Sequence, residues 1–262
     1  RRHDLVTHEG QDALRLVPGS GLGVLRDGAA PSTPAAQPTV SRLSPAAAAL
    51  ARSALPLLVV TKTNTRSTVH RHGYTDYIGV KRYASDGSVC GEHRFVGLFT
   101  SSAYSARVDE TPLLRGKVDA IAARAGLPAG GHSAKALAHI LERYPRDDLF
   151  QIGDDELYET ALGILALADR QRLRLFLRRD AYQRFVSCLL FVPREAYSTD
   201  LRLRCERILM AALGGASAEF EVQLGAAALA CIHYVIRTTP GTAAVYDRRA
   251  LESRLEIGRA HV

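Results

Sequence analysis

Alternation of apolar and polar residues marks the first part of the chain as rich in strands. The runs Tyr74–Tyr83 and Val89–Thr100 flank residues Ala84–Ser88, which include an Asp-Gly pair. An Asp-Gly pair between two such runs favours a hairpin, because glycine accepts a positive φ without steric cost. Further strand-like patterns lie between residues 4 and 25. We therefore predict a small mixed or antiparallel sheet domain over residues 1–105.

Residues 29–44 interrupt this pattern, since they are mostly Ala, Pro, Ser and Thr. Proline lacks a backbone donor and small polar residues offer little area to bury, so we expect a surface loop here. Ser44 and Pro45 then form the start signal of a short helix, with Ser44 as its N-cap.

Helical spacing of apolar residues characterises the middle of the chain. Three segments have it: Pro112–Ala125, Ser133–Tyr144, and a third that Asp154 or Asp155 would cap. Three short amphipathic helices cannot bury their apolar faces alone, so they must pack together or on a sheet. We predict a three-helix connector over residues 106–168.

The last part of the chain alternates strands and helices. The expected elements are strands at Arg172–Arg179 and Phe185–Val192, a helix from Ser198 or Thr199 to Leu213, strands at Ala218–Leu224 and Leu229–Thr238, and a helix from Arg248. This order is most of a ferredoxin-like βαββαβ unit without its last strand. We predict an α+β fold whose domain at 169–255 is incomplete, with an unpaired edge that risks aggregation.

The composition is that of a globular protein, with 47% hydrophobic and 23% charged residues. The net charge of +7 raises the question of nucleic-acid binding. Only four of the 34 basic residues are lysines, and many arginines have acidic neighbours, as in residues 146–148 and 194–200. A nucleic-acid site gathers its charge into one patch with aromatic residues for stacking. We therefore expect no nucleic-acid partner.

The hydropathy and the cysteines agree with a cytoplasmic protein without membrane association. No apolar run approaches the roughly 18 residues of a membrane span, and no segment resembles a secretory signal. The cysteines lie far apart without a CxxC pair: Cys90, Cys188, Cys205 and Cys231. Such spacing predicts buried reduced thiols rather than a metal or redox site.

The segment Gly19–Gly23 resembles a dinucleotide-binding loop only superficially. Its spacing is GxGxG rather than GxGxxG, no helical pattern follows, and the position of the expected acid is Leu43. We interpret it as a tight turn and expect this chain to bind no NAD.

Histidines in the hairpin region are weak metal candidates. His70 and His72 share a strand face and could meet His93 across the sheet, but Arg66 and Arg71 would oppose a cation. Solvent-facing strand residues are the better interpretation. The same region holds the residue types of a hydrolytic triad, without a signal of its geometry: Ser67, His70 and Asp76. We expect no metal and no nucleophile.

Several ordered segments, taken together, resemble the N-terminal region of the large bacterial NAD-specific glutamate dehydrogenases. They are TRSTVHR (65–71), Y-x-DYIGVKR (74–82), GE-x-RF-x-GL-x-TS (91–101), TPLLRGKV (111–118), YPRDDLFQIGDDELYETALGIL (144–165) and RQRLRLFLRRDAYQRFVSCLLFVPREAYSTDLR (170–202). The resemblance implies a PAS-like or ACT-like first domain and an ACT-type last domain. It implies that the parent enzyme oxidises L-glutamate with NAD, in a catalytic domain outside this chain.

Under this resemblance the chain carries no catalytic, cofactor-binding or metal-binding residues, and NAD belongs to the parent enzyme. The implied role is regulatory or structural, with the rest of the polypeptide, a second copy and an amino-acid effector as partners. ACT-type modules bind such effectors near the loop between a strand and a helix N-terminus. The corresponding loop contains Pro193, Arg194, Glu195 and Ser198, where free N–H groups could receive a carboxylate.

Both ends suggest a piece of a longer reading frame. The chain starts at Arg1 without methionine, and residues 256–262, EIGRAHV, match the translation of a common sequencing adapter. We expect the biological sequence to stop near Leu255. The alternative function is a stand-alone ACT-type amino-acid-sensing module without catalysis.

Overall fold

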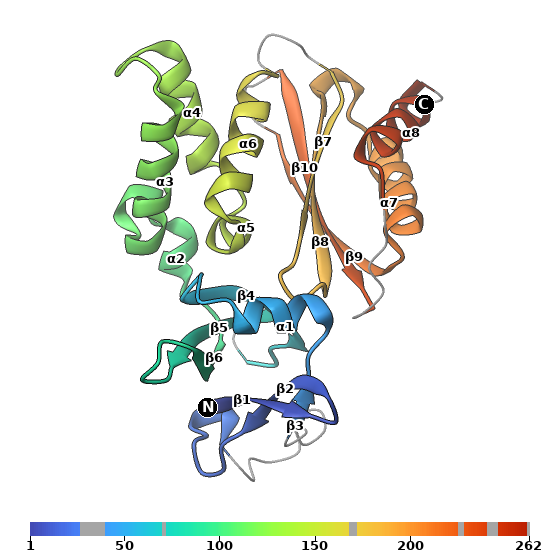
Figure 1. Cartoon of the computed structure of the whole chain (residues 1–262). Coiled ribbons are helices and arrows are strands. Elements are labelled where there is room, and N and C mark those ends of the chain that lie inside the picture. Colours follow the sequence, from blue (N-terminus) through green and yellow to red (C-terminus); the bar gives the residue numbers. More distant parts are fainter. Residues whose placement is uncertain (27–39, 70–71, 168–171, 225–227, 240–245, 261–262) are drawn as a thin grey trace. The chain divides into compact units, whose positions relative to one another are not determined.

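The computed structural model describes the chain except for residues 27–39, 70–71, 168–171, 225–227, 240–245 and 261–262, and the side chains of 257–260. The described residues form two compact units, 1–101 and 102–262. Figure 1 shows the elements of each unit. The predicted loop at 29–44 falls largely outside the described residues.

One antiparallel sheet makes up the first unit. Among the described residues its order is β3-β2-β1-β6-β5-β4, with every neighbouring pair antiparallel. The strands are β1 (Arg2–His8), β2 (Gln11–Leu16), β3 (Val40–Arg42), β4 (Leu58–Arg66), β5 (Tyr74–Tyr83) and β6 (Val89–Gly97). The predicted hairpin is β5 and β6. At its turn Gly87 has a φ of 82°, which explains the glycine.

The helix α1 (Pro45–Arg52) begins as the sequence predicts. Ser44 Oγ accepts a hydrogen bond at 3.3 Å from a backbone N–H of the first turn. At the other end, Lys81 Nζ donates to the carbonyls of Leu50 at 2.7 Å and Ser53 at 2.6 Å. The ammonium thus satisfies carbonyls that the end of a helix leaves open.

One face of the first sheet is polar although it is buried. Glu92 lies opposite His3 on β1 and Lys81 on β5, accepts from the Tyr77 hydroxyl at 2.6 Å, and accepts from Arg94 at 2.8 Å. Burial and the nearby Arg94 charge lower the pKa of His3 to about 3, so its ring is neutral. The buried charges here are therefore paired, as stability requires.

Helices open the second unit. They are α2 (Ser101–Ser105), the 3₁₀ turn η2 (Val108–Glu110), α3 (Pro112–Ala125), α4 (His132–Glu142), α5 (Arg146–Gln151) and α6 (Asp154–Leu165). We call α3 to α6 the helical segment. The N-cap position of α6 is Gly153, so the predicted aspartate cap is wrong. Asp154 and Asp155 lie instead in the first turn, where carboxylates favour the helix dipole.

A four-stranded antiparallel sheet follows, in the order β7-β8-β10-β9. Its elements are β7 (Arg174–Arg179), β8 (Phe185–Pro193), the 3₁₀ turn η3 (Arg194–Ala196), α7 (Thr199–Leu213), β9 (Gly215–Gln223), β10 (Leu229–Thr238) and α8 (Arg248–Ala260). From β8 to α8 the connectivity is that of the predicted ferredoxin-like unit. Such a unit places its last strand beside its first, and β7 lies at that edge of the sheet.

Helices cover both faces of this sheet (Figure 1). On one face, α7 and α8 enclose an apolar core with inward residues of all four strands, including Leu190, Leu209 and Tyr234. On the other face lies the helical segment. There α6 lies close to β7, as shown by Gly163: a Cβ at this position would come within 2.7 Å of the Phe176 ring. The second unit is thus a three-layer arrangement with the sheet in the middle.

Candidate functional site

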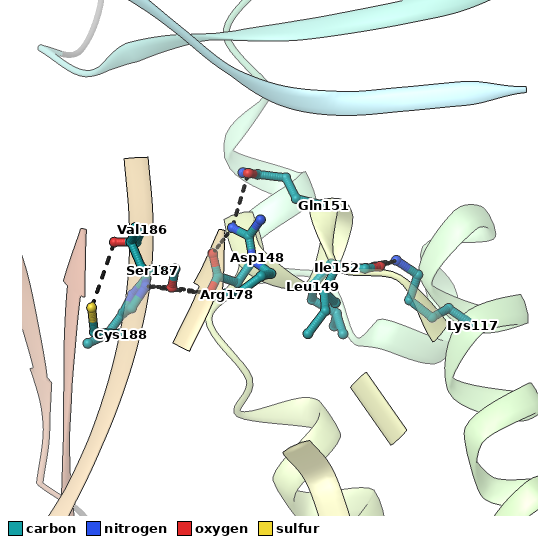
Figure 2. Close-up of polar contacts among 10 residues, drawn as sticks. Lys117, Asp148, Leu149, Gln151, Ile152, Arg178, Val186, Ser187 and Cys188 are labelled. Atoms are coloured by element: carbon teal, nitrogen blue, oxygen red, sulfur yellow. Dashed lines mark hydrogen bonds and ion pairs between the residues drawn. The ribbon is translucent and has the colours of Figure 1, made fainter. Parts of the chain in front are cut away.

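A buried polar cluster joins the helical segment to the sheet, and we call it the Asp148 cluster (Figure 2). Its members come from α5 and three strands: Asp148 and Gln151 from α5, Arg178 from β7, Ser187 from β8 and His233 from β10. The register places Arg178 opposite Ser187, which explains why a residue of α5 reaches both.

Asp148 is the centre of this cluster. Its Oδ1 accepts from Arg178 Nη2 at 2.5 Å, and its Oδ2 accepts a short hydrogen bond from the Ser187 hydroxyl. Ser187 Oγ lies 2.9 Å from His233 Nε2, and Gln151 Oε1 accepts from Arg178 Nη2 at 3.2 Å. Asp148 is 2% exposed and Ser187 1%. The centre of the cluster is therefore closed to solvent, while Gln151 at its edge is half-buried.

The electrostatics favour a charged pair despite this burial. Burial is the largest influence on Asp148 and raises its pKa, but Arg178 and His233 together with the hydrogen bonds outweigh it and hold the pKa of the carboxyl below its usual value. Burial likewise opposes the charge of Arg178, yet the Asp148 carboxylate raises the pKa of the guanidinium. Two buried charges are tolerated because each satisfies the other.

The cluster contains the residue types of a hydrolytic triad in an arrangement that does not suit that chemistry. In a triad, one histidine nitrogen faces the serine and the other faces the carboxylate. Here His233 Nε2 faces both Ser187 and Asp148, the latter at 3.6 Å, and Asp148 also binds the serine hydroxyl directly. The geometry supports a structural connection between two layers.

Lys117 holds the opposite side of α5. Its Nζ donates to the backbone carbonyls of Leu149 at 3.0 Å and Ile152 at 2.5 Å, at the end of that helix (Figure 2). Burial lowers the pKa of Lys117, with Asp154 acting in the opposite direction. The helix α5 is thus bound from α3 through its carbonyls and from the sheet through Asp148.

The predicted effector loop lies at the start of α7, as expected. Ser198 is the N-cap of that helix, since its Oγ accepts from the Leu201 N–H at 3.1 Å. Pro193 is buried, while Arg194 and Glu195 are exposed in η3. Arg202, which could have paired with this loop, binds Glu206 at 2.9 Å.

The other residues that the sequence analysis considered as site residues do not form a site. Gly19–Gly23 leads into the 3₁₀ turn η1 (Gly23–Leu25) rather than a helix. His72 and His93 are exposed, whereas His70 lies outside the described residues. Asp76 is bound to Lys62 at 2.6 Å. In the part of the chain that the structure describes, no group of three or more His, Cys, Asp or Glu residues could hold a metal ion.

Sequence reasoning missed the Asp148 cluster. One signal was present: Ser187 and His233 interrupt the long apolar runs of β8 and β10. A polar residue inside such a run must find a buried partner. The sequence does not name that partner, because Asp148 lies 39 residues from Ser187.

Comparison with known protein families finds a match for the helical segment and another for the sheet with α7 and α8. Residues 111–170 match the family model described as "Glutamate dehydrogenase, helical motif 1". Residues 174–258 match "Glutamate dehydrogenase, ACT2 domain". The two ranges together cover more than half of the chain. The chain belongs to the glutamate dehydrogenase family that these models describe.

Relatives in this family support the assignment. The NAD-specific glutamate dehydrogenase of Halomonas elongata is 42% identical over 199 residues, which are 76% of this chain and 12% of that protein. The Pseudomonas aeruginosa enzyme is 41% identical over 199 residues, again 76% of this chain and 12% of that protein. The Mycobacterium tuberculosis enzyme is 35% identical over 182 residues. The chain thus spans about an eighth of the length of these relatives.

The family assignment also places the cluster. Asp148 and Gln151 belong to helical motif 1, and the strand residues belong to the ACT2 domain. The Asp148 cluster is therefore a polar contact between the residues that match helical motif 1 and those that match the ACT2 domain. As for membranes, no helix among the described residues has the length and apolar character to span one.

Proposed function

We propose that this chain is a non-catalytic regulatory and structural segment of an NAD-dependent glutamate dehydrogenase. The full-length enzyme would convert L-glutamate, NAD⁺ and water to 2-oxoglutarate, ammonium, NADH and a proton in the cytoplasm. The observation that carries the proposal is the continuous match to helical motif 1 and the ACT2 domain, in a chain that spans 12% of its relatives.

The chemistry of the described site supports a role without catalysis. The serine hydroxyl of the Asp148 cluster is buried and already bound to the carboxylate and the histidine. A substrate could not reach Ser187 without opening the contact between the two domains. We therefore assign the chemistry, and the NAD site, to the rest of the polypeptide.

The proposed regulatory site is the loop between β8 and α7. The N-terminus of α7, a helix of 15 residues, carries a positive dipole end that suits an amino-acid carboxylate. Arg194 and Glu195 are exposed beside it and match the two charges of a free amino acid. A second copy of the chain would complete the site, as in a homo-oligomer.

The test uses the full-length enzyme with and without the residues that correspond to 102–258. We expect the deletion to change the oligomeric state, measured by light scattering, and to abolish the response of the rate to amino acids. An unchanged assembly and an unchanged response would contradict the proposal.

Calorimetry of this chain against a panel of amino acids tests the loop separately. Arg194→Ala should abolish saturable binding, and Arg207→Ala on the exposed side of α7 is the matched control. Binding that survives Arg194→Ala would place the effector elsewhere.

A further inference from the structure

The short helix α5 is attached to its surroundings on several sides. Asp147 accepts from the Tyr104 hydroxyl at 2.8 Å, and Arg146 donates to the carbonyl of Ala106 at 3.0 Å. Lys117 binds the carbonyl end of the helix from α3. Asp148 binds the sheet. A helix of six residues has little stability of its own, so these attachments stabilise α5.

The sheet, in contrast, has a core that does not need α5. All buried members of the apolar cluster between the sheet and α7/α8 lie between Leu173 and Leu255. The helical segment contributes none of them. The ACT2 domain therefore has its own core, and the helical segment lies on its other face.

The contact between the two domains includes a buried charge pair. Such pairs add little net stability over an apolar contact, but losing one partner leaves the other charge buried and uncompensated. A contact of this kind favours one arrangement of the helical segment on the sheet. Removing one charge of the pair strongly destabilises that arrangement. The pair Asp148–Arg178 thus sets how the helical segment lies on the sheet.

We propose that α5 is a latch that connects α3 to the ACT2 sheet through two attachments in series, Lys117 to its carbonyl end and Asp148 to the strands. Loss of either attachment loosens the helical segment on the sheet, where α6 also packs against Phe176, while the sheet, α7 and α8 stay folded. The inference concerns a conformational device within the second unit and does not depend on the proposed effector.

Hydrogen exchange of the whole chain, resolved by mass spectrometry, tests the latch. Asp148→Asn should raise the exchange of amides in α3 to α6 by about tenfold or more, with β8, β10 and α7 changed by less than about twofold. Lys117→Met should act on the same amides. Because the attachments are in series, the double variant should exchange no faster than the faster single variant.

The chain offers a matched control pair. Arg124 on α3 binds Asp155 on α6 at 2.6 Å, with the carboxylate side chain 92% exposed. Asp155→Asn, and Lys135→Met at an exposed position of α4, repeat the two chemical changes at the surface and should leave exchange nearly unchanged. Should Asp148→Asn fail to fold, Ser187→Ala removes one hydrogen bond to the same carboxylate and should produce a smaller release of the same amides.

Three results would overturn the latch. One is unchanged exchange in α3 to α6 for the folded variants. Another is a uniform rise across the whole second unit, which would mean a single cooperative unit. The third is a double variant whose effect equals the product of the single effects, which would mean two independent attachments.

Discussion

At the scale of residues, Asp148 connects the helical segment to the sheet. Its carboxylate accepts hydrogen bonds from an arginine and a serine and lies near a histidine, and these three residues come from three different strands. A side chain of this size can do so only because the register brings Arg178 and Ser187 opposite each other. The charge is retained in the interior because its partners compensate for the lost hydration.

Asp148 should make the free energy of unfolding depend on pH in the acid range. In the folded chain, the pKa of Asp148 is held below the ordinary aspartate value. The carboxylate therefore stabilises the folded chain fully at any pH above the ordinary pKa of aspartate. This stabilisation is lost as the pH falls through the pKa of the folded state. At neutral pH, Asp148→Asn should lower the free energy of unfolding by about 3 kcal/mol. Urea unfolding should show this difference shrinking below about pH 4.

The exposed Asp155 provides the control for this measurement. Asp155→Asn loses an exposed ion pair and a favourable place in the first turn of α6, and should differ from the unaltered chain by less than about 1 kcal/mol. A difference for Asp148→Asn that stays constant from neutral to acid pH would show that the carboxylate is not stabilised by its partners.

At the scale of elements, the ends of helices follow local rules where a capping side chain is present. Ser44 and Ser198 both accept from the first turn of their helices, as their sequence context predicts. The helix α7 ends at Gly214, whose φ of 64° suits glycine. At α4 and α6 the N-cap residues are Gly131 and Gly153, which have no side chain to accept such a hydrogen bond.

Ser198→Ala should destabilise α7. The substitution removes the hydrogen bond to the Leu201 N–H, a loss of about 1 kcal/mol in the free energy of unfolding. Urea unfolding followed by circular dichroism measures it. The adjacent Thr199→Ala removes an exposed hydroxyl and should change the free energy by less than about 0.5 kcal/mol. Equal effects of the two substitutions would mean that the cap contributes nothing.

At the scale of the whole molecule, the chain consists of two units with interiors of different kinds. The first combines a buried polar face around Glu92 and Lys81 with buried apolar residues such as Leu14, and the second has an apolar core around residues such as Leu209. Each interior is built from residues of its own unit. The units should therefore respond separately to changes in their interiors.

Two substitutions test this separation. Leu209→Ala in the second core should cost about 2 to 5 kcal/mol and raise hydrogen exchange only within residues 102–260. Lys81→Met leaves two helix carbonyls without their donor and should raise exchange only within residues 1–101. Exchange that rises in both units after either substitution would show one cooperative fold.

The sequence by itself determined the local features of this protein. The hairpin of β5 and β6, the bounds of α3, the strand β10 and the serine caps all follow from turn chemistry, periodicity and capping, which act over a few neighbouring residues. The ordered segments 144–165 and 170–202 were also enough to indicate the family.

Only the tertiary structure decided which distant residues meet. Pro145 signals the end of one helix, but whether α5 forms after it depends on attachments to α3 and to the sheet. In the same way, β7 takes an edge position that no local pattern assigns to it. Asp148 looks like a surface acid in a charged stretch. It is buried because packing brings strands from later in the chain around it, and local propensity carries no information about such contacts.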